Sequence, residues 1–317
     1  MKAGGAVVIL SLLAGGCAAQ RAGAPQPSQG TPEAVSLLGE PLLAPALAPE
    51  RRTELEARLA AARAEWERAP GDADAIIWLG RRTAYLGRFR EAIDIFGEGI
   101  RRHPRDARLY RHRGHRYITV RRFDLAERDF ERAAALIEGV ADEVEPDGIP
   151  NARNVPTSTL QSNVWYHLGL ARYLQGDFAG ALEAYRHGME VSENDDTRVA
   201  MSHWLYMTLR RLGRDAEAAA VLVPIRDAMD IVENGDYHRL LLLYQGKLRT
   251  DDLVRESGEA GSVANATIGY GVGNWYLYNG RREDALRTFK RVLSGGQWPA
   301  FGHVASEADL KRMGGRR

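Results

Sequence analysis

Large apolar and small side chains recur along this chain at a fixed interval. Four positions return with identical residues, a glycine, a phenylalanine, an alanine and a second phenylalanine. They are Gly80, Phe89, Ala92 and Phe96 in one copy and, 34 positions later, Gly114, Phe123, Ala126 and Phe130. Such a period predicts an array of helical hairpins, in which small residues let two helices approach and aromatic rings fill the space between them.

The same phase returns three more times, more weakly in the fourth copy. It predicts five repeats, at 73–106, 107–140, 162–195, 199–232 and 266–299, and a degenerate repeat at 233–265. A helix within 50–70 is expected to lead into the array. Residues 300–317 are predicted to form a polar capping helix, because the ends of a solenoid must face water.

The period and its anchors resemble the tetratricopeptide repeat (TPR), a pair of antiparallel helices of 34 residues. The resemblance covers most of the chain after residue 50 and implies an all-α fold, a right-handed α-solenoid. It is specific for the fold and weak for function, because such repeats serve many partners. The runs NVWYHLGLARYL and IGYGVGNWYLYNG also resemble stretches of bacterial proteins of this class.

The N-terminus carries a targeting segment. Lys2 precedes an apolar run over 7–13, small residues fill 14–16, and the only cysteine of the chain, Cys17, follows. The run is too short to span a bilayer and is set aside from the fold. It resembles the bacterial lipoprotein signal, which implies removal of 1–16 and lipidation of Cys17, and Ala18 favours the outer membrane, facing the periplasm. The alternative is an ordinary secretory signal with an incidental cysteine.

Residues 17–49 are rich in Ala, Pro, Gly and Gln and are predicted to form a flexible tether, because they bury too little apolar area to offset ordering. Four leucines in this stretch are candidates for docking onto the folded part. They are Leu37, Leu38, Leu42 and Leu43.

Charge and motif content exclude several functions. The chain has 43 basic and 42 acidic residues, which argues against a nucleic-acid partner. A single cysteine leaves neither a disulfide nor a thiolate metal site. His112 and His115 stand three residues apart on one predicted helix, but no third ligand has a matching spacing, so groove-facing or solvated histidines are favoured over a metal. Without a phosphate-binding loop or a serine elbow, neither an enzyme nor a cofactor is expected.

The resemblance also identifies the concave wall, which in this fold comes from positions 2, 5, 9, 12 and 13 of each first helix. Among those positions only Asp74 is acidic, whereas arginine and tyrosine are frequent, so a basic, aromatic groove for an anionic or carboxylate-bearing ligand is predicted. Chance composition is the alternative. The candidate binding residues are Arg81, Tyr85, Arg108, Arg111, His115, Tyr166, Tyr173, His203, Arg210, Tyr270, Asn274 and Tyr278.

One segment, 141–161, belongs to no repeat. It has three prolines and a net charge of −3, opposite to the predicted charge of the groove. We expect it to fold over the concave side, with its acidic part near Arg108, Arg111 or His115; a disordered linker is the alternative.

The leading hypothesis is a lipid-anchored scaffold or adaptor that binds a protein or peptide in the bacterial cell envelope. The alternative is a solute- or glycan-binding lipoprotein whose pocket is closed by 141–161. A peptide groove should stay open along several repeats, whereas a small-molecule site needs closure around a few polar groups.

Overall fold

The computed structural model describes residue 1 and residues 30–149, 151–256 and 262–314. The predicted signal segment and Cys17, the predicted lipidation site, lie outside these residues. The folded unit begins at Thr31, and only this unit is described below.

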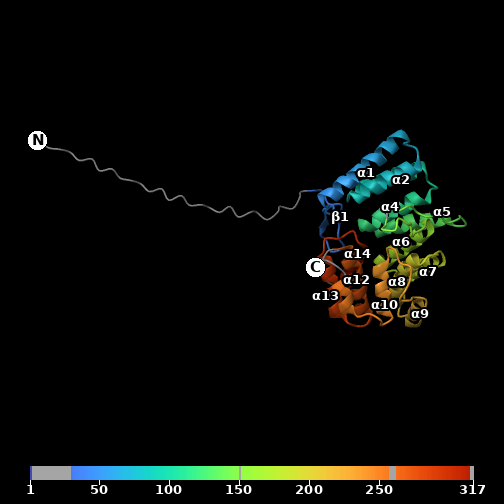
Figure 1. Cartoon of the computed structure of the whole chain (residues 1–317), viewed down its shortest axis with the longest axis vertical. Helices are drawn as coiled ribbons and strands as arrows, with labels where there is room; N and C mark the ends of the chain where they lie inside the picture. The colour runs from blue at the N-terminus through green and yellow to red at the C-terminus, as the bar shows by residue number, and fades with distance from the viewer. Residues whose placement is uncertain (2–29, 150, 257–261, 315–317) are drawn as a thin grey trace. The chain divides into compact units, whose positions relative to one another are not determined.

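Within the described residues the unit is almost entirely helical (Figure 1). Short strands β1 (Ala34–Val35) and β2 (Pro41–Leu42) pair in antiparallel fashion. The helices are α1 (Pro49–Arg68), α2 (Ala73–Tyr85), α3 (Phe89–Arg102), α4 (Ala107–Thr119), α5 (Phe123–Ile137), α6 (Leu160–Gln175), α7 (Phe178–Glu190), α8 (Asp195–Arg211), α9 (Asp215–Leu222), α10 (Gly235–Tyr244), α11 (Thr250–Glu256), α12 (Val263–Tyr278), α13 (Arg282–Leu293) and α14 (Phe301–Arg312).

Consecutive helices pack as hairpins, and each predicted repeat corresponds to one hairpin. The small anchors meet the aromatic anchors as the spacing predicts. A Cβ at Gly114 would lie 2.8 Å from the Phe130 ring, and one at Gly273 would lie 2.5 Å from Phe289. Phe130 and Phe289 are fully buried. The prediction of an α-solenoid of helical hairpins is confirmed.

The turn inside each hairpin requires a left-handed residue. Glycine supplies it at Gly87, Gly176 and Gly213, among others, whereas the α4–α5 turn has Arg121, with φ of 63°. A side chain in this conformation is unfavourable unless its surroundings compensate. The Arg121 guanidinium forms two hydrogen bonds to Glu307 of α14, at 3.1 and 2.6 Å, and this buried pair compensates.

Helix α14 corrects the prediction of a polar capping helix. It packs against α12, α13 and the first helix of the third repeat, α6 (Figure 1), and residues 302–310 are all buried. Small side chains make this possible: Gly302 lies so close to the backbone of Ala266 that a Cβ there would clash. Helix α14 therefore fills part of the concave side, the side formed by the first helices of the repeats.

Residues 31–48 correct the predicted extent of the tether. The Leu37 N–H donates to Glu307 at 3.0 Å, and the Trp298 indole N–H donates to the Leu43 carbonyl at 2.7 Å. Leu42 is buried, and Leu37 and Leu38 pack against the core, so the predicted docking of these leucines is confirmed. The folded part thus begins before α1. None of the described helices is long and apolar enough to cross a membrane.

Candidate functional site

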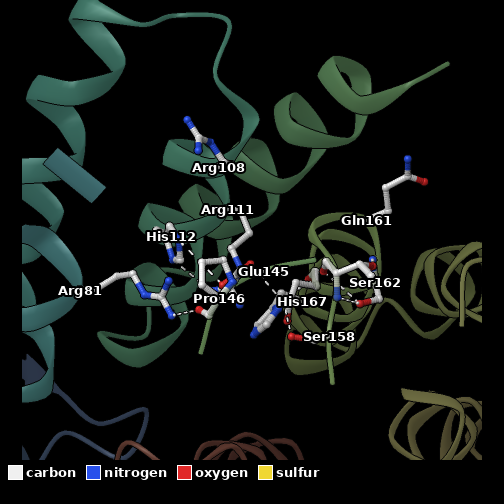
Figure 2. Close-up of polar contacts among 12 residues, drawn as sticks. Arg81, Arg108, Arg111, His112, Glu145, Pro146, Ser158, Gln161, Ser162 and His167 are labelled. Carbon is white, nitrogen blue, oxygen red and sulfur yellow. Dashed lines mark hydrogen bonds and ion pairs between the residues drawn. The ribbon is translucent and has the colours of Figure 1, made fainter. Parts of the chain in front are cut away.

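The segment 141–161 lies over the first helices of the first three repeats, and its acidic part meets the predicted basic residues (Figure 2). The Glu145 carboxylate pairs with Arg111 Nε at 2.9 Å, and Arg81 donates to the Pro146 carbonyl at 2.8 Å. The prediction that this segment folds back onto the concave side is confirmed.

The segment is fixed at both ends. At its base, Val144 and Thr159 form an antiparallel bridge, and the Glu145 N–H donates to the Ser158 carbonyl at 3.0 Å. At its far end, Arg153 pairs with Asp230 at 2.6 Å. The backbone pairing at the base and the ion pair at the far end both hold the segment in place. The alternative of a disordered linker is therefore wrong for the described residues. We call residues 141–161 the cover.

Besides Asp230, a second acidic residue of the segment after α9, Glu233, also contacts the cover. Glu233 accepts hydrogen bonds from the Asn151 amide at 2.8 Å and from the Thr157 hydroxyl at 3.1 Å. Asp196, at the start of α8, fixes the backbone of Glu233 in turn, through its N–H at 3.1 Å. The cover therefore spans from the second repeat to the segment after α9.

Two of the cavities beneath this cover adjoin each other, and together we call them the chamber. The arginine pocket, of about 130 Å³, is lined by side chains of α2, α3, α4 and the cover. The aromatic pocket, of about 310 Å³, is lined by α4, the cover, α6, α8, the 230–237 segment and Phe301. Arg111 and His115 belong to the walls of both.

The arginine pocket holds three guanidinium groups and one carboxylate, that of Glu145. Arg111 is paired with Glu145, and Arg81 donates to a carbonyl and lies 4.4 Å from the centre of the Trp78 ring. Within the described residues the Arg116 guanidinium has no hydrogen bond and no ion pair, and it lies 5.8 Å from the centre of the Phe89 ring. Burial lowers the pKa of Arg116 to about 10, and neighbouring Arg111 and Arg81 act in the same direction, against Tyr85.

Three histidines border the arginines. Burial, together with the nearby arginines, holds the pKa of His112, His115 and His167 well below the usual value, so all three are neutral at pH 7. The His115 ring lies 4.7 Å from His167 and 5.3 Å from Phe301, centre to centre. No group of three His, Cys, Asp or Glu side chains suited to a metal occurs among the described residues.

The aromatic pocket adds hydroxyl and amide groups. The Tyr166 hydroxyl lies 2.9 Å from that of Tyr237 and accepts from the Trp204 indole at 2.8 Å. Asn163 donates to Glu145 at 3.1 Å and to Ser158 at 2.9 Å. This pocket therefore offers stacking surfaces and polar groups to the body of a ligand, while the arginine pocket attracts an anionic group.

The structure divides the predicted groove residues into two sets. Arg81, Tyr85, Arg111, His115 and Tyr166 line the chamber. Arg108 points away, to Asp74 and Asp106, each at 2.7 Å, and these bonds raise its pKa, with the Asp106 bond contributing most.

The other six predicted residues lie outside the chamber, in contacts within the chain. The Tyr270 hydroxyl donates to Asp309 of α14 at 3.0 Å and lies 2.8 Å from the Tyr173 hydroxyl. Asn274 and His203 are buried. Arg210 lies 4.4 Å from the centre of the Tyr278 ring and pairs with Asp215 at 2.8 Å. Around these six residues, α14 and the aromatic core occupy the concave side of the described chain.

The candidate binding residues predicted from the sequence omit several residues that line the chamber, among them His112, Arg116, His167, Glu233 and Tyr237. His112 and Arg116 stand four residues apart, the spacing of one helix face, and that signal was available. It was overlooked because the concave positions carried over from the resemblance skip both.

No family model and no curated protein matches this chain. Among solved structures, YrrB, described as a TPR protein with an unusual peptide-binding site, is 18% identical over 80% of this chain and 99% of its own, with a TM-score of 0.43. A tetratricopeptide repeat protein from Parabacteroides merdae is 16% identical over 81% of this chain and 93% of its own, with a TM-score of 0.48. MamA is 14% identical over 64% of this chain and 99% of its own, with a TM-score of 0.42. The repeated hairpins of the chain itself make the fold an α-solenoid, as the resemblance to the tetratricopeptide repeat implies.

Proposed function

We propose that this chain is a binding protein, with no catalysis of its own, that holds the carboxylate or another oxyanion group of its ligand in the chamber. One observation carries the proposal. Arg116 faces the arginine pocket without an acidic partner among the described residues, next to two further guanidiniums, of which Arg111 pairs with Glu145 and Arg81 donates to the Pro146 carbonyl.

A guanidinium without a counter-charge is unfavourable away from water, because the lost hydration is not replaced. Proteins accept such a cost at sites that receive an opposite charge from a ligand. Arginine suits this task, because its planar fork donates two parallel hydrogen bonds to a carboxylate or phosphate.

The cover restricts the size of the ligand. Helix α14 and segment 141–161 occupy the concave side, so a long extended peptide has no continuous path along the first helices. This favours a small acid, the alternative of the two sequence hypotheses, over a peptide laid along the array. The terminal carboxylate of a peptide offers the same chemistry and is the second source to test.

Cell-envelope anchoring is part of the proposal. If Cys17 is acylated, the lipid chains hold the binding unit at the membrane, since each buried methylene contributes about 0.8 kcal/mol. Incorporation of labelled fatty acid should be lost in Cys17→Ser. Unchanged labelling in that variant would leave an ordinary secretory signal as the explanation.

Calorimetry on the purified full chain tests binding directly, with acetate, succinate and sulfate as probes. A short peptide, compared with its C-terminal amide, separates a free acid from a chain end. Arg116→Gln should weaken binding about 10- to 100-fold, because charge-assisted hydrogen bonds contribute about 1.5–3 kcal/mol.

The matched control is Arg132→Gln, which removes an exposed arginine from α5 and should leave affinity unchanged. Equal binding by the parent and Arg116→Gln, or no binding of any probe, would reject the proposal.

A further inference from the structure

His115 occupies the junction of the two pockets, because it contributes to the walls of both. Its ring packs at a tilt against the rings of His167 and Phe301, with interplanar angles of 38° and 49°, and within the described residues neither ring nitrogen has a hydrogen-bond partner. The two neighbouring histidines each have a polar contact at one ring nitrogen. His112 Nδ1 lies 3.1 Å from Arg111 Nη1, and His167 Nδ1 lies 2.6 Å from the Asn163 carbonyl. His115 is therefore the histidine with both nitrogens available to a ligand.

Charged and titratable groups face His115 from each surrounding element. From α2 and α4 they are Arg81, Tyr85, Arg111, His112 and Arg116; from the cover, Glu145; and from α6 and the 230–237 segment, Tyr166, His167, Glu233 and Tyr237. Helix α14 contributes Phe301, which does not ionise. The cations nearest the arginine pocket outnumber its one carboxylate, so the empty chamber opposes a proton on His115.

We infer that His115 binds the anionic group of the ligand together with a proton, so that the chamber takes up weak acids, carboxylic acids or phosphate monoesters, as an anion plus a proton. This inference rests on the proposed function. An anion beside Arg116 cancels the repulsion that keeps His115 neutral, and the protonated imidazole then donates a charge-assisted hydrogen bond to it. No covalent bond changes: one proton moves from solvent to a ring nitrogen.

The sign of the effect follows from linkage. Burial and the adjacent arginines lower the pKa of His115 in the empty chamber, and a bound anion raises it. Between these two pKa values each binding event takes up a proton, so affinity increases as pH falls. Above and below that window affinity is independent of pH.

Sulfate is the decisive probe, because it stays doubly charged between about pH 5 and pH 8, the range in which histidine titrates. Any proton taken up then belongs to the protein. Calorimetry of the full chain in buffers of different ionisation heat should give close to one proton per bound sulfate, and affinity should rise up to about tenfold per pH unit inside the window. Succinate serves as the carboxylate probe.

His115→Gln should bind sulfate more weakly, with no proton uptake and no pH dependence. His187→Gln, which removes an exposed histidine of α7, should behave like the parent. Sulfate binding without proton uptake in the parent, or uptake that persists in His115→Gln, would overturn this inference and leave the proposed function standing. Failure of both sulfate and succinate to bind at any pH would overturn both.

Discussion

The two halves of the concave side are built from the same kind of first helix but are covered differently. Against α12 and α13, helix α14 packs closely, and its acids are paired: Asp309 meets Arg211 of α8 at 2.9 Å, and Glu307 meets Arg121 at 2.6 Å. Over α2, α4 and α6, the irregular segment 141–161 leaves the chamber, in which Arg116 has no acidic partner among the described residues. The same surface thus becomes core in one half and encloses the chamber, the proposed binding site, in the other.

The nature of the cover explains the difference. A helix with small residues such as Gly302, Ala305 and Ala308 can lie against other helices at close range. A segment with proline and asparagine turns satisfies its own backbone and cannot fill a surface evenly. Cavities therefore persist where a loop covers the repeats.

The largest effect is expected where α14 is tied down. Arg121→Met keeps the length of the side chain and the left-handed backbone but leaves Glu307 buried without its main partner. We expect a loss of about 3–5 kcal/mol in the free energy of unfolding, because breaking a buried pair strands the remaining charge. Urea denaturation measures it; a loss below about 1 kcal/mol would mean that α14 is held by packing alone.

The repeat core should not distinguish the two halves. Phe130 and Phe289, one in each half, are fully buried against Gly114 and Gly273. Each change to alanine should cost about 3–5 kcal/mol, the usual loss for a buried aromatic ring. Phe178→Ala should cost less, because that ring is only half-buried. A large difference between Phe130→Ala and Phe289→Ala would show that the halves differ in their cores and not only in their covers.

The ring-on-glycine packing that both halves share also explains how far the sequence could predict the fold. A ring on a glycine within one hairpin is a local arrangement, and its period is visible in the chain, so the hairpins and their boundaries were predictable. The place of α14 was not. Glu307 and Asp309 gave it a polar character, and their partners Arg121 and Arg211 lie 186 and 98 residues away. No local pattern identifies such a pair.

The candidate site was predictable in part, for a similar reason. Opposite charge indicated where the segment 141–161 goes, and Glu145 does meet Arg111. The sequence could not indicate which arginines remain without an acid, because that depends on every partner in three dimensions. That Arg116 has no acidic partner among the described residues therefore emerged only from the structure.

Acid should lower the stability of the half covered by α14 through one group, the carboxylate of Glu307. Burial alone would raise the pKa of Glu307, but hydrogen bonds from His303 and Arg121 outweigh it and hold this pKa at about 2, against a usual value of 4.5. A carboxylate whose pKa is lowered by folding stabilises the fold at pH values above the pKa that it has in the unfolded chain. This contribution is lost as pH falls from about 4.5 to 2. The loss should reach roughly 3 kcal/mol.

Unfolding measured across that range in the parent and in Glu307→Gln checks this. The variant should be less stable at pH 7 and should depend less on pH between about 4.5 and 2. Parallel curves for the two proteins would assign the acid sensitivity to other carboxylates.

The smallest effect on the free energy of unfolding is expected for a change in the chamber. The sign of that effect is the sharpest test of the difference between the two halves of the concave side. Arg116→Met replaces a guanidinium that has no acidic partner among the described residues with an apolar side chain of similar length against Phe89. Exchanging a poorly compensated charge for an apolar group is neutral or stabilising, so the free energy of unfolding should stay the same or rise by up to about 1 kcal/mol. Anion binding should be lost in the same variant, measured by calorimetry with sulfate. A residue that weakens the fold but sustains binding is one retained for its ligand. If Arg116→Met instead destabilises the chain as much as Arg121→Met, then Arg116 is a structural arginine and the two halves do not differ in kind.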